Sequence, residues 1–174
     1  MPETDTVTPE QLADLPTRNG FRQRGMEMTR LETFTDAAFA FVVTLLVVGG
    51  GDSVPMNFDE MINALKQVPA FIASFANIMW FWYAHHVWSR RFGLEDAATI
   101  ALNGVLLFVI TFYIYPLKFL ANFLVGVFLG FPDGRRVGDV ITPGEGVHLM
   151  VIYAIGYATI WIVFILLYAR AYAK

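Results

Sequence analysis

Four blocks of apolar residues alternate with polar segments along the chain, at about residues 31–50, 61–86, 97–120 and 147–170. A helix rises 1.5 Å per residue, so about 20 apolar residues cross the ~30 Å hydrocarbon layer of a membrane. Backbone groups left unpaired in lipid cost several kcal/mol each, so each block is expected to be helical. The pattern predicts an all-α integral membrane protein with four transmembrane helices per subunit.

The polar segments between the blocks predict the topology. Residues 1–29 are mostly polar and are expected to form a cytoplasmic N-terminal tail, while residues 30–172 form one transmembrane domain. Arginine and lysine are concentrated on alternate sides of the blocks, at Arg18, Arg22, Arg24, Arg30, Arg90, Arg91, Arg170 and Lys174. The loop at 51–60 has no basic residue, and the loop before residue 147 mixes both signs. Because cytoplasmic loops carry the excess of basic residues, both termini are expected to be cytoplasmic.

Composition agrees with a membrane protein and excludes several classes of function. Hydrophobic residues make up 56% of the 174 residues and charged residues 16%, whereas soluble domains usually have about a quarter charged. The net charge of −3 provides no basic surface for nucleic acid. The chain has no cysteine, which excludes disulfides, thiolate catalysis and cysteine-ligated metals. We expect a lipid bilayer as the surrounding partner and no cofactor.

Chemically informative residues gather in the first predicted helix. Asp36 lies more than one turn inside it, where an acidic side chain costs roughly 2.5–3.5 kcal/mol unless it faces protein or water. Arg30 precedes Asp36 by six residues, which places the two side chains about 120° apart on a helix. Each is therefore expected to contact other helices. The candidates are His85, His86 and Asn103, which the topology places in the same cytoplasmic half of the membrane.

Two interpretations of these polar residues are open. Buried polar groups in helical bundles often only hold helices together, and this interpretation is favoured over a proton or ion relay. A haem site is disfavoured because adjacent His85 and His86 point about 100° apart and His148 belongs to the opposite side of the membrane. Zinc would need a third and a fourth ligand at short range, and the sequence suggests none.

A second pattern in the first helix is a single stripe of residues at helical spacing. Phe41, Thr44, Leu45 and Val48 follow the i, i+3, i+4, i+7 pattern, and Ala37 extends it toward the cytoplasm. Asp36 lies about 140° from Phe41 around the helix and should point into the bundle. By spacing alone, the stripe is more typical of a surface that packs on another helix or faces lipid than of a pore.

The motifs resemble those of a known family. The first helix opens with Arg30-x-x-x-Phe34-Thr35-Asp36, which is similar to the signature of potassium channels related to transmembrane protein 175, the endosomal/lysosomal potassium channel. The resemblance continues with Ser74-Phe75, Trp82-Tyr83-Ala84-His85-His86, Leu102-Asn103 and Tyr115-Pro116. Three motifs in order on three consecutive predicted helices, over roughly residues 30–120, make a specific match.

The resemblance implies a homotetramer whose first helices line a central pore for potassium ions, in a prokaryotic plasma membrane. It also implies a polar network behind the pore, which in this chain would comprise Arg30, Thr35, Asp36, His85, His86 and Asn103. Ion selection in the family is attributed to aliphatic and hydroxyl rings. Phe41 stands where the family has Ile or Leu, and Thr44, Leu45 and Val48 follow it. Prokaryotic members usually have six transmembrane helices, whereas four are predicted here, as in a shortened member or one that lost two outer helices.

The sequence therefore favours a tetrameric, potassium-permeable cation channel with hydrophobic and threonine rings as its constriction. One alternative is a non-conducting membrane scaffold or partner subunit plugged by Phe41. Another is a proton pathway through Asp36 and His85 or His86. An enzyme is not expected, because the sequence suggests no nucleophile–base pair and no metal ligand set.

Overall fold

The computed structural model describes residues 16–18, 21–22, 29–48, 55–131 and 134–173, which are mostly helical. Its elements in chain order are β1 (Thr17–Arg18), β2 (Phe21–Arg22), α2 (Arg30–Val48), α3 (Phe58–Lys66), α4 (Val68–Phe92), α5 (Ala97–Leu129), α6 (Val137–Val140) and α7 (Pro143–Tyr172). The strands β1 and β2 pair antiparallel, with Thr17 opposite Arg22. This short hairpin lies within the predicted N-terminal tail, where no strand was expected.

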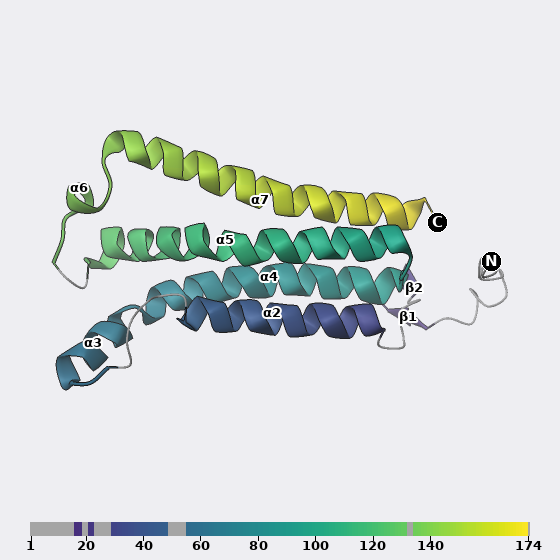
Figure 1. Cartoon of the computed structure of the whole chain (residues 1–174), viewed down its shortest axis with the longest axis horizontal. Coiled ribbons are helices and arrows are strands. Elements are labelled where there is room, and N and C mark those ends of the chain that lie inside the picture. Colours follow the sequence, from purple (N-terminus) through teal and green to yellow (C-terminus); the bar gives the residue numbers. More distant parts are fainter. Residues whose placement is uncertain (1–15, 19–20, 23–28, 49–54, 132–133, 174) are drawn as a thin grey trace.

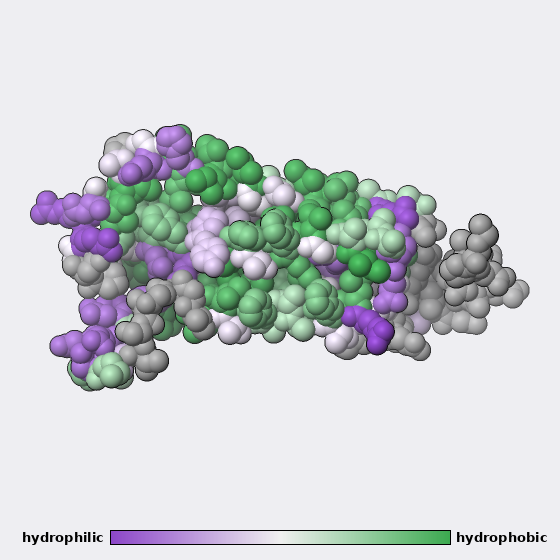
Figure 2. Space-filling model, in the orientation of Figure 1, coloured by the Kyte–Doolittle hydropathy of each residue, from purple (hydrophilic) through white to green (hydrophobic). Residues whose placement is uncertain are grey.

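Four long helices, α2, α4, α5 and α7, lie side by side and alternate in direction (Figure 1). Helix α5 packs against α2, α4 and α7, and α2 also packs against α4. The short helices α3 and α6 lie at one end of the bundle, whereas β1 and the end of α7 lie at the other (Figure 1). Figure 2 shows apolar residues over much of the middle of the visible face and hydrophilic residues gathered toward its two ends. The apolar blocks of the sequence therefore form one helical bundle.

The bundle core consists of apolar side chains contributed by all four long helices. Buried members of this cluster include Phe39, Val42, Leu46, Ile78, Phe81, Trp88, Leu106, Ile110, Ile160, Phe164 and Leu167. The ring of Tyr113 on α5 lies against the backbone of Gly156 on α7. A Cβ atom at position 156 would lie 2.6 Å from Cδ2 of Tyr113, so only glycine fits there without a shift. The core side chains fill the space between the helices of a single subunit.

The second predicted helix, residues 61–86, is two helices in the structure. Asn57 caps α3 by accepting a 2.9 Å hydrogen bond from the backbone N–H of Glu60. A single residue, Gln67, separates α3 from α4, and Pro69 occupies the first turn of α4, where its missing N–H is tolerated. Helix α4 then continues six residues beyond the predicted end, to Phe92, and stops at Gly93, whose φ of 56° is left-handed.

The third and fourth predicted helices are longer than the hydropathy pattern indicated. Helix α5 continues through Pro116 and Lys118 to Leu129, because residues 119–129 remain apolar. Lys118 therefore lies inside α5, and its Nζ donates a 3.2 Å hydrogen bond to the backbone oxygen of Leu46 in the last turn of α2. Helix α7 begins at Pro143, four residues early, because Thr142 and Glu145 form a capping box. The first helix, predicted over 31–50, is described from Arg30 to Val48, and residues 49–54 lie outside the described part.

Length and composition alone mark two of the described helices, Ala97–Leu129 and Gly144–Tyr172, as long and apolar enough to cross a membrane. Helices α2 and α4 are more polar. Helix α2 carries Arg30, Glu32 and Asp36 in its first two turns, and the second half of α4 carries histidines and arginines. How these polar side chains are accommodated determines whether α2 and α4 can also lie in a bilayer.

Candidate functional site

One side of α2 is exposed along its whole length, although most of its residues are apolar. Phe34, Phe41 and Val47 are 64%, 59% and 61% exposed, respectively. Phe39, Val42 and Leu46, on the opposite side, are buried against the bundle. Such a contiguous exposed apolar surface is typical of an interface with protein or lipid. We call these exposed residues the α2 stripe: Phe34, Ala37, Ala40, Phe41, Thr44 and Val47.

The structure places the predicted pore residues in different surroundings. Ala37, Phe41 and Thr44 are exposed and belong to the α2 stripe, whereas Leu45 is half-buried beside it. The side chain of Val48 lies outside the described part. The Thr44 hydroxyl donates a 3.1 Å hydrogen bond to the backbone oxygen of Ala40. Because a hydroxyl oxygen also has two lone pairs, Thr44 can still offer an acceptor to a cation.

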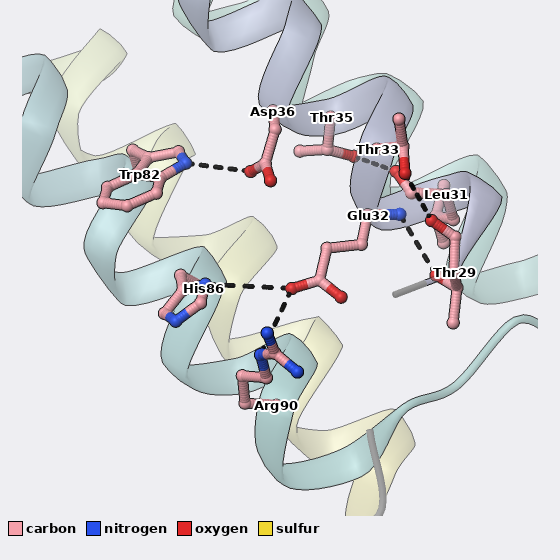
Figure 3. A network of polar contacts seen from close by, with 9 residues as sticks. All are labelled: Thr29, Leu31, Glu32, Thr33, Thr35, Asp36, Trp82, His86 and Arg90. Carbon is pink, nitrogen blue, oxygen red and sulfur yellow. Dashed lines mark hydrogen bonds and ion pairs between the residues drawn. The ribbon is translucent and has the colours of Figure 1, made fainter. Parts of the chain in front are cut away.

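On its inner side, the start of α2 contacts a ladder of residues in α4. Trp82, His86 and Arg90 are spaced four residues apart and therefore lie on one face of α4. Trp82 Nε1 donates a 2.9 Å hydrogen bond to Asp36 Oδ1. Glu32 Oε1 lies 3.7 Å from His86 Nδ1 and 3.7 Å from Arg90 Nε. Figure 3 shows both carboxylates of α2 turned toward this ladder.

Glu32 was not among the residues predicted for the polar network. Its side chain is only 3% exposed, so it is more deeply buried than Asp36. The backbone N–H of Glu32 donates a 3.1 Å hydrogen bond to Thr29 Oγ1 (Figure 3). A signal was present in the sequence, because Glu32 and Asp36 are four residues apart and share a helix face. Because Glu32 lies only three residues after the predicted N-terminal tail, the sequence pattern did not indicate that its side chain is buried.

Arg30 and Thr35 differ in their surroundings. Arg30 is exposed at the first position of α2, whereas the contacts of Asp36 and Glu32 described above come from α4. Thr35 is fully buried, and its hydroxyl donates a 2.8 Å hydrogen bond to the backbone oxygen of Leu31 (Figure 3). Thr35 is therefore satisfied within its own helix.

A second polar contact connects α4 to α5. His85 Nε2 lies 2.6 Å from Asn103 Oδ1, and both side chains are 1% exposed. Because an amide oxygen only accepts, this contact requires the tautomer in which His85 Nε2 carries the proton. The amide nitrogen of Asn103 donates to the backbone oxygen of Thr99 at 2.9 Å. His85 and Asn103 thus pair with each other, whereas the sequence offered both as partners for Asp36.

A third polar contact joins the start of α5 to the end of α7. Asp96 Oδ2 accepts hydrogen bonds from Arg170 Nε at 3.1 Å and Arg170 Nη2 at 2.5 Å. The other carboxylate oxygen of Asp96 accepts from the Thr99 hydroxyl. A guanidinium that donates two bonds to one carboxylate holds it more firmly than a single contact does. The Asp96–Arg170 contact therefore ties the start of α5 to the end of α7.

The described residues contain no group of three histidine, aspartate or glutamate side chains that could hold a metal ion. His85 and His86 contact different helices, and His148 Nδ1 contacts the backbone oxygen of Gly144 at the opposite end of the bundle. The polar side chains of α2, α4 and α5 described above contact one another: Asp36 with Trp82, Glu32 with His86 and Arg90, and His85 with Asn103. Their arrangement holds α2 against α4 and leaves the α2 stripe facing outward.

Comparison with known proteins identifies the family. The family model described as endosomal/lysosomal potassium channel TMEM175 matches residues 30–113. A solved structure of a variant of the potassium channel MtTMEM175, bound to a nanobody–MBP fusion protein, superposes with a TM-score of 0.82. It is 36% identical, and the match covers 91% of this chain and 69% of that one. The chain belongs to the TMEM175 family.

Two curated relatives of this TMEM175 family member are also named as potassium channels. A protein of Marivirga tractuosa named "Potassium channel" is 41% identical over 157 residues, which are 87% of this chain and 62% of the relative. A potassium channel of Chamaesiphon minutus is 32% identical over 107 residues, which are 57% of this chain and 52% of the relative. The chain thus spans only about half to three fifths of these relatives.

The family match confirms the resemblance that the motifs predicted. Its residues 30–113 include the α2 stripe, the α4 ladder and Asn103, whereas α7 lies outside the matched segment. Membership of a channel family, together with the apolar helices α5 and α7, makes the chain a membrane protein of an ion-transport family. Both curated relatives are named as potassium channels.

Proposed function

We propose that this chain is the subunit of a potassium-permeable channel in which four copies of α2 surround the pore. The observation that carries the proposal is the α2 stripe, a row of exposed apolar residues and one threonine on a helix whose other side is buried. The relatives named as potassium channels indicate the permeant ion. The proposal does not require a filter of backbone carbonyls, because rings of side chains and hydrophobic constrictions can also select and gate ions.

The proposal requires α2, α4, α5 and α7 all to cross the bilayer. Polar residues of α2 and α4 do not contradict this, because Glu32 and Asp36 contact α4 inside the subunit and would be shielded from lipid. Arg30, Arg90, Arg91 and Arg170 all belong to the end of the bundle where β1 lies (Figure 1). The excess of basic residues at this end supports a cytoplasmic location for both termini in a bacterial plasma membrane.

Assembly of several subunits follows from the packing of one. Buried apolar side chains pack between the four long helices, so the described part of one subunit offers no central path for an ion. A pore would have to form between copies of the chain, and closed rotational symmetry would place the same stripe of each copy around one axis. A ring of four α2 helices would remove the exposed Phe34, Phe41 and Val47 side chains from contact with lipid and turn them toward the axis or the neighbouring copies.

The α2 stripe supports a specific constriction. Four Phe41 side chains would form an apolar ring that excludes water and gates the pore by dewetting. Thr44, about one helical turn further on, would present a hydroxyl oxygen to an ion that had lost part of its hydration shell. The permeation path would then consist of an apolar gate followed by a polar ring.

A proton pathway through Asp36 and the histidines is less well supported. Asp36 accepts from the Trp82 indole, which is a donor only and cannot accept a proton in turn. His85 pairs with Asn103, and His86 lies beside Glu32. These contacts hold the helices in place and do not form one continuous chain of groups that both accept and donate protons.

Potassium flux from liposomes that contain the purified chain tests the proposal. We expect potassium efflux above that of protein-free liposomes, and a tetrameric mass in native mass spectrometry. A tetramer without flux would favour the scaffold plugged by Phe41. A stable monomer would rule out a pore built from α2. Proton flux without potassium flux would support the pathway through Asp36.

A further inference from the structure

Helix α3, between the first two long helices, has two sides of opposite character. Phe58, Met61 and Leu65 are 70%, 41% and 56% exposed, and their spacing places them on one side of the helix. Asp59, Glu60, Asn63 and Lys66 occupy the other side. In the described part of the chain, α3 has no buried residue. The apolar side of α3 is therefore uncovered within one subunit.

The apolar side of α3 continues into the exposed surface of α4. Leu65, Val68, Ile72 and Phe75 follow one another at steps of three or four residues and are all exposed. Gln67, between the two helices, has helical backbone angles, with φ −84° and ψ −11°. The exposed apolar surface is therefore continuous from α3 to α4, and the same surroundings, lipid or protein, should cover both.

The position of α3 on the bundle indicates that lipid covers its apolar side. Helix α3 lies beyond the end of α2, at the end of the bundle opposite β1 (Figure 1). If α4 crosses the bilayer, its first residue, Val68, lies near the membrane surface, and α3 ends only two residues earlier. A short amphipathic helix at this depth can place its apolar side among acyl chains and its polar side among headgroups.

We infer that α3 is an interfacial helix whose partner is the lipid surface, with Phe58, Met61 and Leu65 inserted at the headgroup–acyl boundary. The nine residues of α3 by themselves are too few for a stable protein interface, which uses about 20–30 residues on each side. Charge does not drive the contact, because the polar side carries Asp59 and Glu60 against Lys66 alone. The lipid is therefore bound through its apolar boundary, and neutral phosphatidylcholine suffices.

The inference rests on the proposed crossing of α4 but not on conduction. It assigns α3 a mechanical role, because an anchored α3 fixes the depth at which α4 starts. Through the α4 ladder, the depth of α4 also sets the depth of Asp36 and Glu32 on α2.

Site-directed spin labelling tests the inference directly, since the chain has no cysteine to remove. Single cysteines replace Phe58, Met61 or Leu65 on the apolar side, and Asp59 or Asn63 serve as matched controls on the polar side. Each labelled full-length variant is placed in phosphatidylcholine liposomes, and collisions with oxygen and with a water-soluble nickel complex are measured. All five side chains are exposed, so labelling should not disturb the core.

We expect the ratio of oxygen to nickel collisions to be several-fold higher at Phe58→Cys, M61C and L65C than at Asp59→Cys and N63C. Adding anionic lipid should leave this contrast unchanged. Equal nickel access at all five positions would place α3 in water and overturn the inference. Shielding of the apolar positions from both reagents would show that protein covers them, which also overturns it. Potassium flux from the same liposomes is scored separately, so a failure of conduction does not alter the lipid result.

Discussion

Trp82 of α4 donates its indole N–H to Asp36 of α2 across 2.9 Å, and this contact ties the two helices together one turn inside the bundle. Glu32, one turn earlier on the same face of α2, lies against His86 and Arg90 of α4. Two carboxylates of α2 therefore contact one ladder of donors on α4. This arrangement positions α2 while leaving the α2 stripe exposed on the described subunit.

Replacing Trp82 by Phe tests the first of these contacts. The variant keeps an aromatic ring but leaves a half-buried Asp36 oxygen without its donor, so we expect a loss of about 1–3 kcal/mol in the free energy of unfolding. Thermal or denaturant unfolding in detergent measures the change. Trp80→Phe is the matched control, because Trp80 is 60% exposed on the same helix. Equal stability of the two variants would mean that the hydrogen bond contributes nothing.

Substitutions of Asp36 itself distinguish a structural contact from a proton relay. Asp36→Asn keeps an oxygen that can accept from Trp82, so it should assemble with little loss of stability. Asp36→Leu removes the acceptor and should weaken or abolish the folded oligomer. Size-exclusion chromatography and proton flux are measured on both. Normal assembly of both variants with altered proton flux would support the relay.

Glu32 gives a prediction that the sequence pattern alone did not. Glu32→Leu removes the carboxylate that lies beside His86 and Arg90, and we expect a loss on the order of 2 kcal/mol in the free energy of unfolding. This is less than the 3–5 kcal/mol of a fully buried pair, because both partners are about a third exposed to solvent. Unfolding in detergent measures it, and Glu95→Leu, at an exposed position, is the control. A loss no greater than that of the control would contradict the role of Glu32.

The sequence predicted the positions of the long helices because apolar blocks of about 20 residues have few alternatives in a membrane. It did not predict the break at Gln67 or the length of α5. Pro69 fits the first turn of a new helix, while Pro116 is tolerated within an existing one, so proline alone does not fix a boundary. The family signature contained Asp36, His85 and Asn103. Which residue of α4 contacts Asp36, however, depends on the position of α4 along the axis of α2, which the sequence does not give. One helical turn of sliding, about 5.4 Å, would exchange Trp82 for His86 opposite Asp36.

The contact between Tyr113 and Gly156 should make position 156 intolerant of any side chain. Gly156→Ala would bring a Cβ within 2.6 Å of the Tyr113 ring, so α5 and α7 must separate or the ring must move. Overpacking of this kind typically costs about 1–3 kcal/mol, measured by unfolding in detergent. Gly104→Ala on α5 is the control, because nothing lies within 4 Å of its added Cβ. Equal free energies of unfolding for the two variants would show that a small shift of the Tyr113 ring accommodates the added Cβ at little cost.

The sharpest test of the channel proposal concerns Phe41, which is 59% exposed on the α2 stripe. Phe41→Ala should widen the proposed apolar ring, raise potassium flux several-fold and weaken discrimination between potassium and sodium, because a wider ring stays wet. Thr44→Val keeps the width but removes the hydroxyl oxygen, so potassium flux should fall. Phe112→Ala is the matched control, since Phe112 is 61% exposed but belongs to α5. Liposome flux assays compare the four proteins. If Phe41→Ala behaves like wild type and like the Phe112 control, Phe41 is not the gate, and the α2 stripe is a packing surface.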